Sequence, residues 1–320
     1  MADPTGSPPL LIGIDVGGTT VKMGFFSEDG TLLHSWEIPT DCTENGRHIL
    51  PDIAKAVQAH LAQTGIGHES VLGIGIGVPG PVNSRGIVNR CINLGWGVLD
   101  LKGELEALTG LPVQAGNDAN VAAMGECWKG GGQGKQDMVL ATLGTGIGGG
   151  ILVGGKMIHG VHGGGGEIGH LNISRTETVP CNCGNYGCAE QYGSATGIVR
   201  TAKRFLETCD APSTLRELET LTAKAIFDAG KANDALALEI LEQVFDDLGV
   251  FLACVCSVCD PEIIVLGGGV SKAGQILLDG VAAHFKKYMF HTGRNIAFAL
   301  ATLGNEAGIY GAFKMALDAI

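Results

Sequence analysis

The sequence predicts an α/β protein built from two similar halves, and a repeated pattern of strands and glycine turns is the main evidence. Residues 11–34 read as an apolar strand, a turn at Gly17 and Gly18, a second strand and a return through Gly30. Residues 139–159 repeat this order, with a glycine turn over 144–150 and a strand over 151–153. Further along, the apolar runs 71–78 and 263–266 each lead into glycine. Each copy has the size of one supersecondary unit, so we expect two halves with a cleft between them.

The first glycine turn favours a β-hairpin over a dinucleotide-binding fold. The residues after Gly18 are β-branched, aromatic or apolar, so a strand is expected to follow. A dinucleotide-binding motif needs a helix there, because the helix N-terminus meets the pyrophosphate. A glycine-rich hairpin turn still presents backbone amides to a phosphate. Asp15, at the end of the first strand, is then placed to hold Mg²⁺ against that phosphate.

Between the repeats, residues 116–120 precede apolar residues at helical intervals. Asn117 or Asp118 would cap that helix through its side chain. Capping is compatible with catalysis, because a carboxylate at a strand end and helix start lies at the rim of the expected cleft. Phosphoryl transfer needs a carboxylate of this kind, which orients the attacking hydroxyl and takes its proton late.

The segment 167–190 predicts a metal site. His170, Cys181, Cys183 and Cys188 supply one imidazole and three thiols, which fill a zinc tetrahedron without an open position. Such a closed site is structural. The intervening glycines at 184 and 187 suit a tight turn around an ion. Zinc would also fix the two carboxylates that flank the segment, Glu167 and Glu190.

A second group, Cys254, Cys256 and Cys259, resembles metal ligands in its spacing. These cysteines lie at the end of an apolar run, 250–258, without histidine, glycine or a polar loop. We therefore expect a buried helix face here.

Composition narrows the class of protein. With 320 residues, 45% hydrophobic and 17% charged, the chain has enough material for two domains. The net charge of −12 and pI near 5.1 argue against nucleic-acid binding and favour a small-molecule partner. No apolar run reaches the length of a membrane span, and residues 1–9 lack the pattern of a signal peptide. We expect a cytoplasmic protein with no membrane partner, whose 10 cysteines are thiols or metal ligands.

Taken together, these motifs occur in an order that resembles the ROK family of sugar kinases, and bacterial glucokinases of that family in particular. The resemblance extends over residues 11–317 and rests on 15–19, 117–120, 167–170, 181–190 and 267–269. It implies an actin-like, hexokinase-like two-domain fold with a duplicated ribonuclease-H-like core and an interdomain cleft. The smaller domain would comprise residues 10–118 and 306–320, completed by the last helix, and the larger domain 119–305 would carry the zinc loop. It also implies ATP with Mg²⁺ as cofactors.

The resemblance further implies a role for each matching residue. Asp118 matches the catalytic base and also binds the sugar. The other residues that match sugar ligands are Asn117, Glu167, His170 and Glu190, with His170 using its second ring nitrogen on zinc. The residues that match phosphate or nucleoside contacts are Gly17, Gly18, Thr19, Gly144, Thr145, Gly146, Gly268 and Gly269. Gly80, Pro81 and the segment 93–96 resemble a wall of the sugar pocket, where Trp96 packs either on the sugar or in a core or interface.

The expected activity is ATP-dependent phosphorylation of the 6-hydroxyl of glucose. Kinases for fructose, N-acetylglucosamine or N-acetylmannosamine share these motifs, and inorganic polyphosphate is an alternative donor. Sugar-sensing repressors also resemble this family, but they place a DNA-binding module ahead of the first strand, and only residues 1–9 stand there. A protein that binds sugar without turnover is a further alternative, which the presence of Asp118 disfavours. The resemblance also implies a homodimer or homotetramer.

Overall fold

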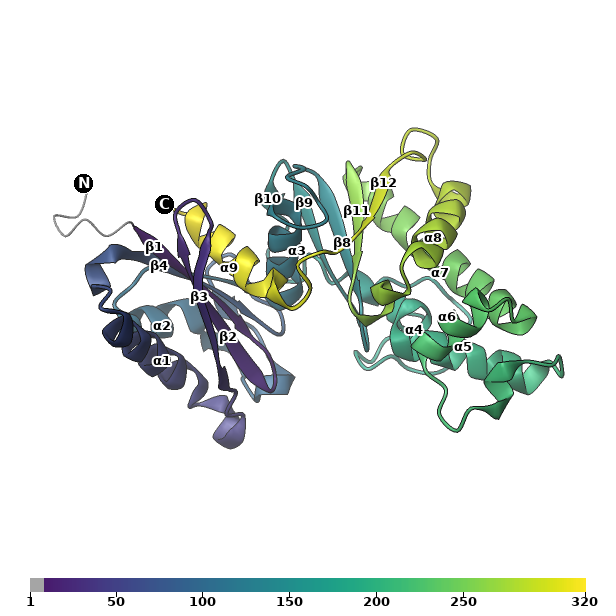
Figure 1. Ribbon diagram of the computed structural model, residues 1–320, viewed down its shortest axis with the longest axis horizontal. Coiled ribbons are helices and arrows are strands. Elements are labelled where there is room, and N and C mark those ends of the chain that lie inside the picture. The colour runs from purple at the N-terminus through teal and green to yellow at the C-terminus, as the bar shows by residue number, and fades with distance from the viewer. Residues whose placement is uncertain (1–8) are drawn as a thin grey trace. The chain divides into compact units, whose positions relative to one another are not determined.

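The computed structural model describes residues 9–320, and its backbone contacts form two compact units (Figure 1). The first unit contains residues 9–134, 157–166 and 305–320, and the second contains 135–156 and 167–304. We expected the boundary at Asp118, but the first unit extends to Gly134. Helix α3 (Asp118–Trp128) packs against the last helix, α9 (Ala307–Leu317), and therefore lies with it in the first unit.

The first unit is built on a five-stranded sheet with the order β3-β2-β1-β4-β7. Strand β1 pairs antiparallel with β2 and parallel with β4, and β4 pairs parallel with β7. Helices α1 and α2 are the crossovers that precede β4 and β7. The bounds are β1 (Leu10–Val16), β2 (Thr20–Ser27), β3 (Leu32–Pro39), η1 (Thr43–Gly46), α1 (Ile49–Thr64), η2 (His68–Ser70), β4 (Val71–Val78), β5 (Ile87–Val88), η3 (Ile92–Leu94), β6 (Leu99–Asp100), α2 (Leu101–Thr109) and β7 (Val113–Asn117).

Helix α9 lies directly on strands β1 and β4, which places the C-terminal helix beside the N-terminal strands (Figure 1). Glycine makes this close approach possible. A Cβ on Gly13 would stand 2.1 Å from the carbonyl oxygen of Ile309, and one on Gly75 would stand 1.8 Å from that of Ala312. No side chain fits between these strands and the helix, so both strand positions require glycine.

The second unit repeats this topology with the sheet order β10-β9-β8-β11-β12. Strand β8 pairs antiparallel with β9 and parallel with β11, as β1 does with β2 and β4. The duplicated α/β fold predicted from the repeats is thus confirmed. The bounds are β8 (Met138–Leu143), β9 (Ile147–Val153), β10 (Lys156–Met157), η4 (Ile168–His170), α4 (Glu190–Gly193), α5 (Ala195–Thr208), η5 (Thr214–Glu217), α6 (Ala223–Lys231), α7 (Ala235–Cys259), β11 (Ile263–Gly267), η6 (Gly269–Ala273), α8 (Gln275–Tyr288), β12 (Ala297–Leu300) and η7 (Gly304–Glu306).

The second glycine turn is shorter than expected. We placed the turn over 144–150, but β9 already begins at Ile147, so the later glycines are strand residues. The reason is long-range packing, because a Cβ on Gly149 would lie 2.3 Å from Cδ1 of Ile168 in η4. These glycines let the segment that carries His170 approach the sheet.

Helix α7 is partly buried, which corrects the expectation for 250–258. Cys256 is fully buried, but Cys254 is exposed and Val258 is 90% exposed. Residues four apart lie on one helical stripe, and the stripe of Cys254 and Val258 faces away from the core. Within residues 9–320, no helix, α7 included, is both long and apolar enough to traverse a lipid bilayer.

Candidate functional site

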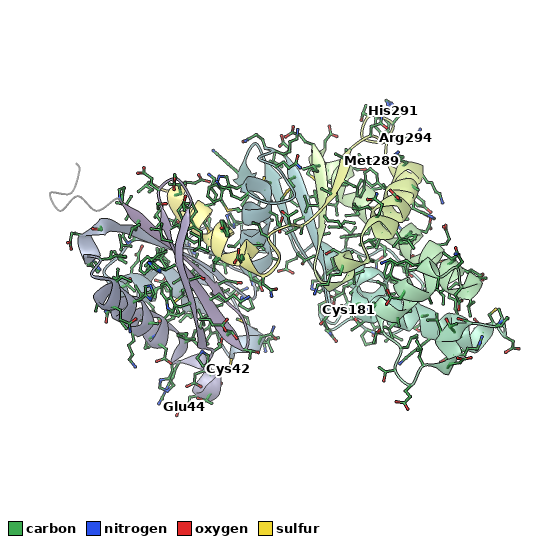
Figure 2. All side chains as sticks on the ribbon, in the orientation of Figure 1. Cys42, Glu44, Cys181, Met289, His291 and Arg294 are labelled. Carbon is green, nitrogen blue, oxygen red and sulfur yellow. The ribbon has the colours of Figure 1, made fainter. Side chains whose placement is uncertain are left out.

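The structure brings the four predicted zinc ligands together in the second unit. One ligand atom from each of His170, Cys181, Cys183 and Cys188 lies within 4.8 Å of all the others. The Sγ atoms of Cys183 and Cys188 are 3.7 Å apart, and Sγ of Cys181 is 3.8 Å from Nδ1 of His170. A tetrahedron with Zn–S bonds of about 2.3 Å has ligand separations of about 3.8 Å, so these two separations match zinc and the cluster as a whole is compatible with it. Figure 2 marks Cys181 in the loop that precedes α4.

Gln191 holds this metal loop in shape. Its Oε1 accepts hydrogen bonds from the backbone N–H of Gly187 at 2.9 Å and of Cys188 at 3.1 Å, and its Nε2 donates to the carbonyl of Val179 at 2.9 Å. These bonds connect both ends of the cysteine segment to α4. Sequence reasoning missed Gln191, although its position next to Glu190 and three residues after Cys188 was a usable signal.

Glu190 joins the metal loop to the second glycine turn. Its Oε1 accepts a hydrogen bond from the Cys181 thiol at 2.8 Å, and its Oε2 accepts one from the backbone N–H of Ile147 at 3.4 Å. A Cβ on Gly146 would lie only 2.5 Å from Oε2, so the carboxylate rests directly on that turn. Burial, together with the bond to Glu190, raises the pKa of the Cys181 thiol.

His170 presents its two ring nitrogens to different groups. Nδ1 faces the thiol of Cys181 at 3.8 Å, whereas Nε2 faces Oε2 of Glu167 at 3.9 Å. The side chain of Glu167 is 41% exposed and that of His170 is 33% exposed. One nitrogen is thus available to a metal and the other to a ligand near Glu167.

The second turn, Gly144 to Gly146, is anchored by the start of α5. The backbone N–H of Ala195 donates to the carbonyl of Gly144 at 2.8 Å, and Oγ1 of Thr196 donates to the carbonyl of Thr145 at 2.8 Å. Thr145 itself is exposed. The turn therefore offers an accessible backbone beside a helix N-terminus, an arrangement suited to a phosphate.

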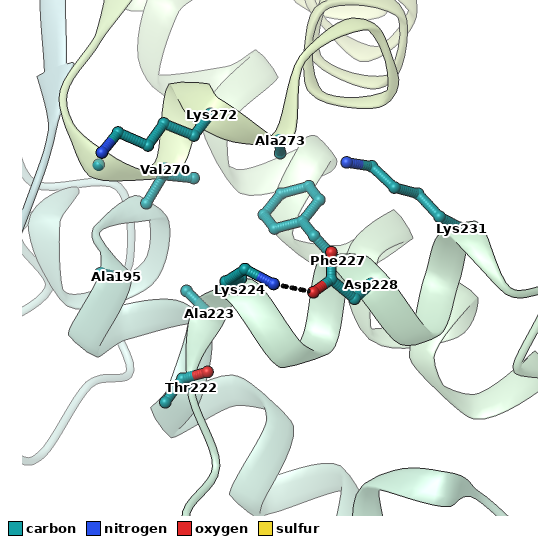
Figure 3. A pocket seen from close by; sticks show the side chains of 11 residues that line it. Ala195, Thr222, Ala223, Lys224, Phe227, Asp228, Lys231, Val270, Lys272 and Ala273 are labelled. Atoms are coloured by element: carbon teal, nitrogen blue, oxygen red, sulfur yellow. Dashed lines mark hydrogen bonds and ion pairs between the residues drawn. The ribbon is translucent and has the colours of Figure 1, made fainter.

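Three cavities in the second unit follow one another along these elements. The first, about 330 Å³, lies between α6 and η6 and is lined by Phe227, Gly269 and Val270 among others. Figure 3 shows the Phe227 ring of α6 on the side of Val270 and Ala273, with Lys224 and Asp228 joined by an ion pair on the same helix. The second, about 530 Å³, shares Ala195, Thr222 and Ala223 with the first. The third, about 220 Å³, shares Thr145, Thr196 and Arg200 with the second and reaches Cys181 and Glu190.

Gly268 and Gly269 follow β11 at the first cavity. Gly268 has a φ of 78°, and a Cβ there would lie 2.6 Å from the carbonyl oxygen of Leu143. A Cβ on Gly269 would meet nothing within 4 Å. Gly268 therefore lets the backbone before η6 lie close to β8, and Gly269 adds no side chain to the wall of the cavity.

The first unit carries the other predicted residues. The turn at Gly17, Gly18 and Thr19 is closed by a hydrogen bond from the N–H of Gly17 to the carbonyl of Thr20 at 2.9 Å, and Gly18 and Thr19 are exposed. Asp15 lies opposite Lys22 in the β1–β2 register. Burial raises the pKa of the Asp15 carboxyl, and the charge of Lys22 opposes this rise.

Asn117 and Asp118 join β7 to α3 as expected. Oδ1 of Asn117 caps the helix by accepting from the N–H of Asn120 at 3.1 Å. Asp118 is the first helical residue, and its Oδ1 accepts from the N–H of Ala119 at 2.8 Å and from Nδ2 of Asn117 at 3.0 Å. Nδ2 of Asn117 also donates to the carbonyl of Gly80 at 3.1 Å, so the cap connects to the predicted pocket wall. The carboxylate is thereby held in one orientation.

In that wall, Trp96 belongs to the core of the first unit. It is 6% exposed, and its indole N–H donates to the carbonyl of Gly46 at 3.1 Å. Asn93 is exposed in the same segment. Of the two roles considered for Trp96, the structure supports core packing.

The duplicated five-stranded sheets, the glycine turns and the Cys/His cluster define a two-unit α/β protein of the hexokinase-like class. The family model described as "ROK family" matches residues 11–319, and the chain belongs to the ROK family. It is 42% identical to a glucokinase of Halalkalibacterium halodurans over 94% of this chain and 92% of that one.

Solved structures agree with this assignment. A ROK hexokinase from Thermus thermophilus is similar with a TM-score of 0.79 and 30% identity, covering 96% of this chain and 97% of that one. A ROK family glucokinase from Streptomyces griseus, in complex with glucose and AMPPNP, is similar with a TM-score of 0.72 and 34% identity, covering 96% and 98%.

Proposed function

We propose that this chain is a glucokinase that transfers the terminal phosphate of ATP to the 6-hydroxyl of glucose. One observation carries the proposal. A single cavity of about 220 Å³ is lined by Glu190, which the metal loop positions, and by Thr145 and Gly146 of the second glycine turn. A sugar-binding carboxylate and a phosphate-binding turn in one cavity are what transfer between the two substrates requires. The high identity to a glucokinase over nearly the whole chain supports glucose as the acceptor.

For the acceptor, Asn117, Glu167, His170 and Glu190 are the proposed sugar ligands. Sugar hydroxyls both donate and accept hydrogen bonds, and carboxylate, amide and imidazole groups satisfy both roles. A sugar lacking one such hydroxyl leaves a polar group of the site unpaired, which provides discrimination. Asp118 is the proposed general base. Its carboxylate is oriented by Asn117 and the N–H of Ala119, which supports a role as a fixed acceptor for the proton of the 6-hydroxyl.

For the donor, the three adjoining cavities support a path along which ATP would lie, from its nucleoside to its phosphates. The nucleoside would occupy the cavity between Phe227 and Val270 (Figure 3), whose lining includes Gly269, the residue after Gly268. The phosphates would follow the shared wall to Thr145 and the turn from Gly144 to Gly146. Gly17, Gly18 and Thr19 are the proposed phosphate contacts of the first unit.

Two metals belong to the proposal. Zinc would be held by His170, Cys181, Cys183 and Cys188, whose ligand atoms lie within 4.8 Å of one another, and it would act as a structural clamp. Mg²⁺ would be bound through the carboxylate of Asp15 and would neutralise phosphate charge when bound. The role of the chain's own residues is to orient substrates and to accept the proton.

The test is a coupled assay of ADP release with glucose, mannose, fructose, N-acetylglucosamine and N-acetylmannosamine. We expect glucose to give the highest kcat/KM with ATP. Absence of turnover on glucose, or a clear preference for an N-acetylated sugar, would contradict the proposal. Repeating the assay with polyphosphate and measuring glucose 6-phosphate identifies the donor. The cytoplasmic location and the homodimeric or homotetrameric state remain predictions, and size-exclusion chromatography with light scattering tests the second.

A further inference from the structure

Arg200, on α5, lies where the proposed donor and acceptor sites adjoin. It lines both the cavity of about 530 Å³ and the cavity of about 220 Å³, and so do Thr145 and Thr196. The smaller cavity also contains Glu190 and Gly146. A guanidinium group here therefore shares its surroundings with the phosphate turn and with a sugar ligand.

A dedicated network holds this guanidinium in place. Nη2 of Arg200 donates to Oε2 of Glu177, whose side chain is only 2% exposed. The hydroxyl of Tyr192 donates to the same oxygen at 2.8 Å, and the guanidinium carbon lies 5.2 Å from the centre of the Tyr192 ring. Although burial opposes ionisation, the N–H of Val179, Tyr192 and Arg200 lower the pKa of Glu177 to about 2, so this carboxylate is charged at neutral pH.

The network leaves donor capacity on Arg200. A guanidinium has five N–H donors, and the bond to Glu177 uses Nη2. Among the residues that the structure describes, Nε of Arg200 is buried without a hydrogen-bond partner, so a ligand would be met by the outer part of the guanidinium, whose side chain is 24% exposed and lines both cavities. Arginine suits phosphate oxygens because its planar fork matches them in geometry and its charge is permanent.

We propose that Arg200 binds the phosphate chain of the donor nucleotide in the cavity beside Thr145, and that Glu177 and Tyr192 position its guanidinium. This proposal rests on the proposed function, because it assumes that the second unit holds the donor. During transfer, negative charge develops on the phosphate oxygens of the departing ADP, and a prepositioned cation stabilises that charge. Arg200 would thus contribute to nucleotide binding and to turnover.

The competing explanation is that Arg200 only neutralises Glu177. Arg204 provides a matched control, because its Nη2 lies 3.3 Å from Oε2 of the same carboxylate. Among the described residues that line the two cavities, however, Arg204 does not occur. A purely structural role predicts similar effects at both arginines, whereas phosphate binding predicts an effect at Arg200 alone.

The experiment compares Arg200→Gln, Arg200→Lys and Arg204→Gln with the unmodified protein. Binding of AMPPNP with Mg²⁺ is measured by calorimetry, KM for ATP and for glucose separately in steady state, and zinc content by elemental analysis. We expect Arg200→Gln to weaken AMPPNP binding and raise KM for ATP by about 10- to 100-fold. KM for glucose and zinc content should stay unchanged, Arg200→Lys should fall between, and Arg204→Gln should have less than about a threefold effect.

Equal effects of Arg200→Gln and Arg204→Gln on AMPPNP binding would overturn the proposal. So would loss of zinc or of glucose affinity in Arg200→Gln with AMPPNP binding intact, because that pattern indicates a structural role. If Arg200→Gln does not fold, the comparison is made with Arg200→Lys, which keeps the positive charge but loses the planar guanidinium. Unchanged AMPPNP affinity in Arg200→Lys then refutes the assignment. Failure of the unmodified protein to bind AMPPNP overturns the proposed function as well, so the two failures are distinguishable.

Discussion

Replacing Gly146 by alanine should displace Glu190 without unfolding the protein. The new Cβ would lie 2.5 Å from Oε2 of Glu190, whereas ordinary contacts begin near 3.4 Å, so the carboxylate must move by about 0.9 Å. That movement strains its bonds to Cys181 and Ile147. The displaced atom is the end of a flexible side chain and Gly146 does not have a positive φ, so we expect little loss of stability.

The expected consequence is a loss in glucose recognition. A ligand misplaced by about 1 Å costs up to about 100-fold, so kcat/KM for glucose should fall by about 10- to 100-fold in Gly146→Ala. The control is Gly144→Ala in the same turn, because the nearest atom to its Cβ would be the carbonyl oxygen of Gly146, at 3.9 Å. The assay is steady-state ADP release with glucose varied at saturating ATP, together with the melting temperature of each variant. A normal KM for glucose in Gly146→Ala, or equal effects of the two alanines, would refute this reasoning.

Two further predictions concern charge. Asp118→Asn should lower kcat by about 10² to 10⁴ fold while glucose binding by calorimetry survives, and near-normal turnover would exclude Asp118 as the base. Burial raises the pKa of the Asp247 carboxyl from 3.8 to about 6; the charge of Asp246 adds to this rise and the hydrogen bond from Gln243 opposes it. Stability is therefore lost as the pH rises from 3.8 through 6, because the folded state holds this proton more tightly than the unfolded state. Asp247→Asn should therefore raise the melting temperature at pH 8 and leave it unchanged below pH 3.8, where the native residue is protonated in both states; a pH-independent difference would contradict this.

Local sequence patterns predicted the topology well, because hairpin turns and apolar strands are encoded over a few neighbouring residues. The turn at Gly17 and Gly18 was followed by a strand, as its β-branched and aromatic residues require. The zinc ligands were also predictable, since a CxC pair, a nearby third cysteine and an upstream histidine form a recognisable set, and the structure places their ligand atoms together.

Features that depend on contacts between distant segments were predicted less well. The glycines from 148 to 150 are strand residues that pair with β8, and Gly149 lies against Ile168, contacts that no local pattern records. The first unit extends past Asp118 because α3 packs on α9, nearly 190 residues later. Exposure of Cys254 likewise depends on which side of α7 the other elements cover.

The supporting residues of the site were missed for the same reason. Glu177 and Arg200 stand 23 positions apart and meet only because the loop before Cys181 folds back onto α5. In the sequence, Glu177 is one polar residue in a polar loop and Arg200 is one cation on an amphipathic helix. The burial of Glu177, its ion pair with Arg200 and the position of Arg200 in the lining of two cavities distinguish them from surface charges, and these features are visible only in three dimensions.

The most direct test of the central claim, that the metal loop positions the sugar ligands, is glucose affinity as a function of zinc content. Zinc is removed stepwise with a chelator and restored, and glucose binding and AMPPNP binding are measured by calorimetry at each occupancy, with Cys183→Ser as the permanently depleted variant. We expect glucose affinity to fall and recover in parallel with zinc while AMPPNP binding persists. Zinc-free protein that binds glucose as tightly as the loaded protein would contradict the claim.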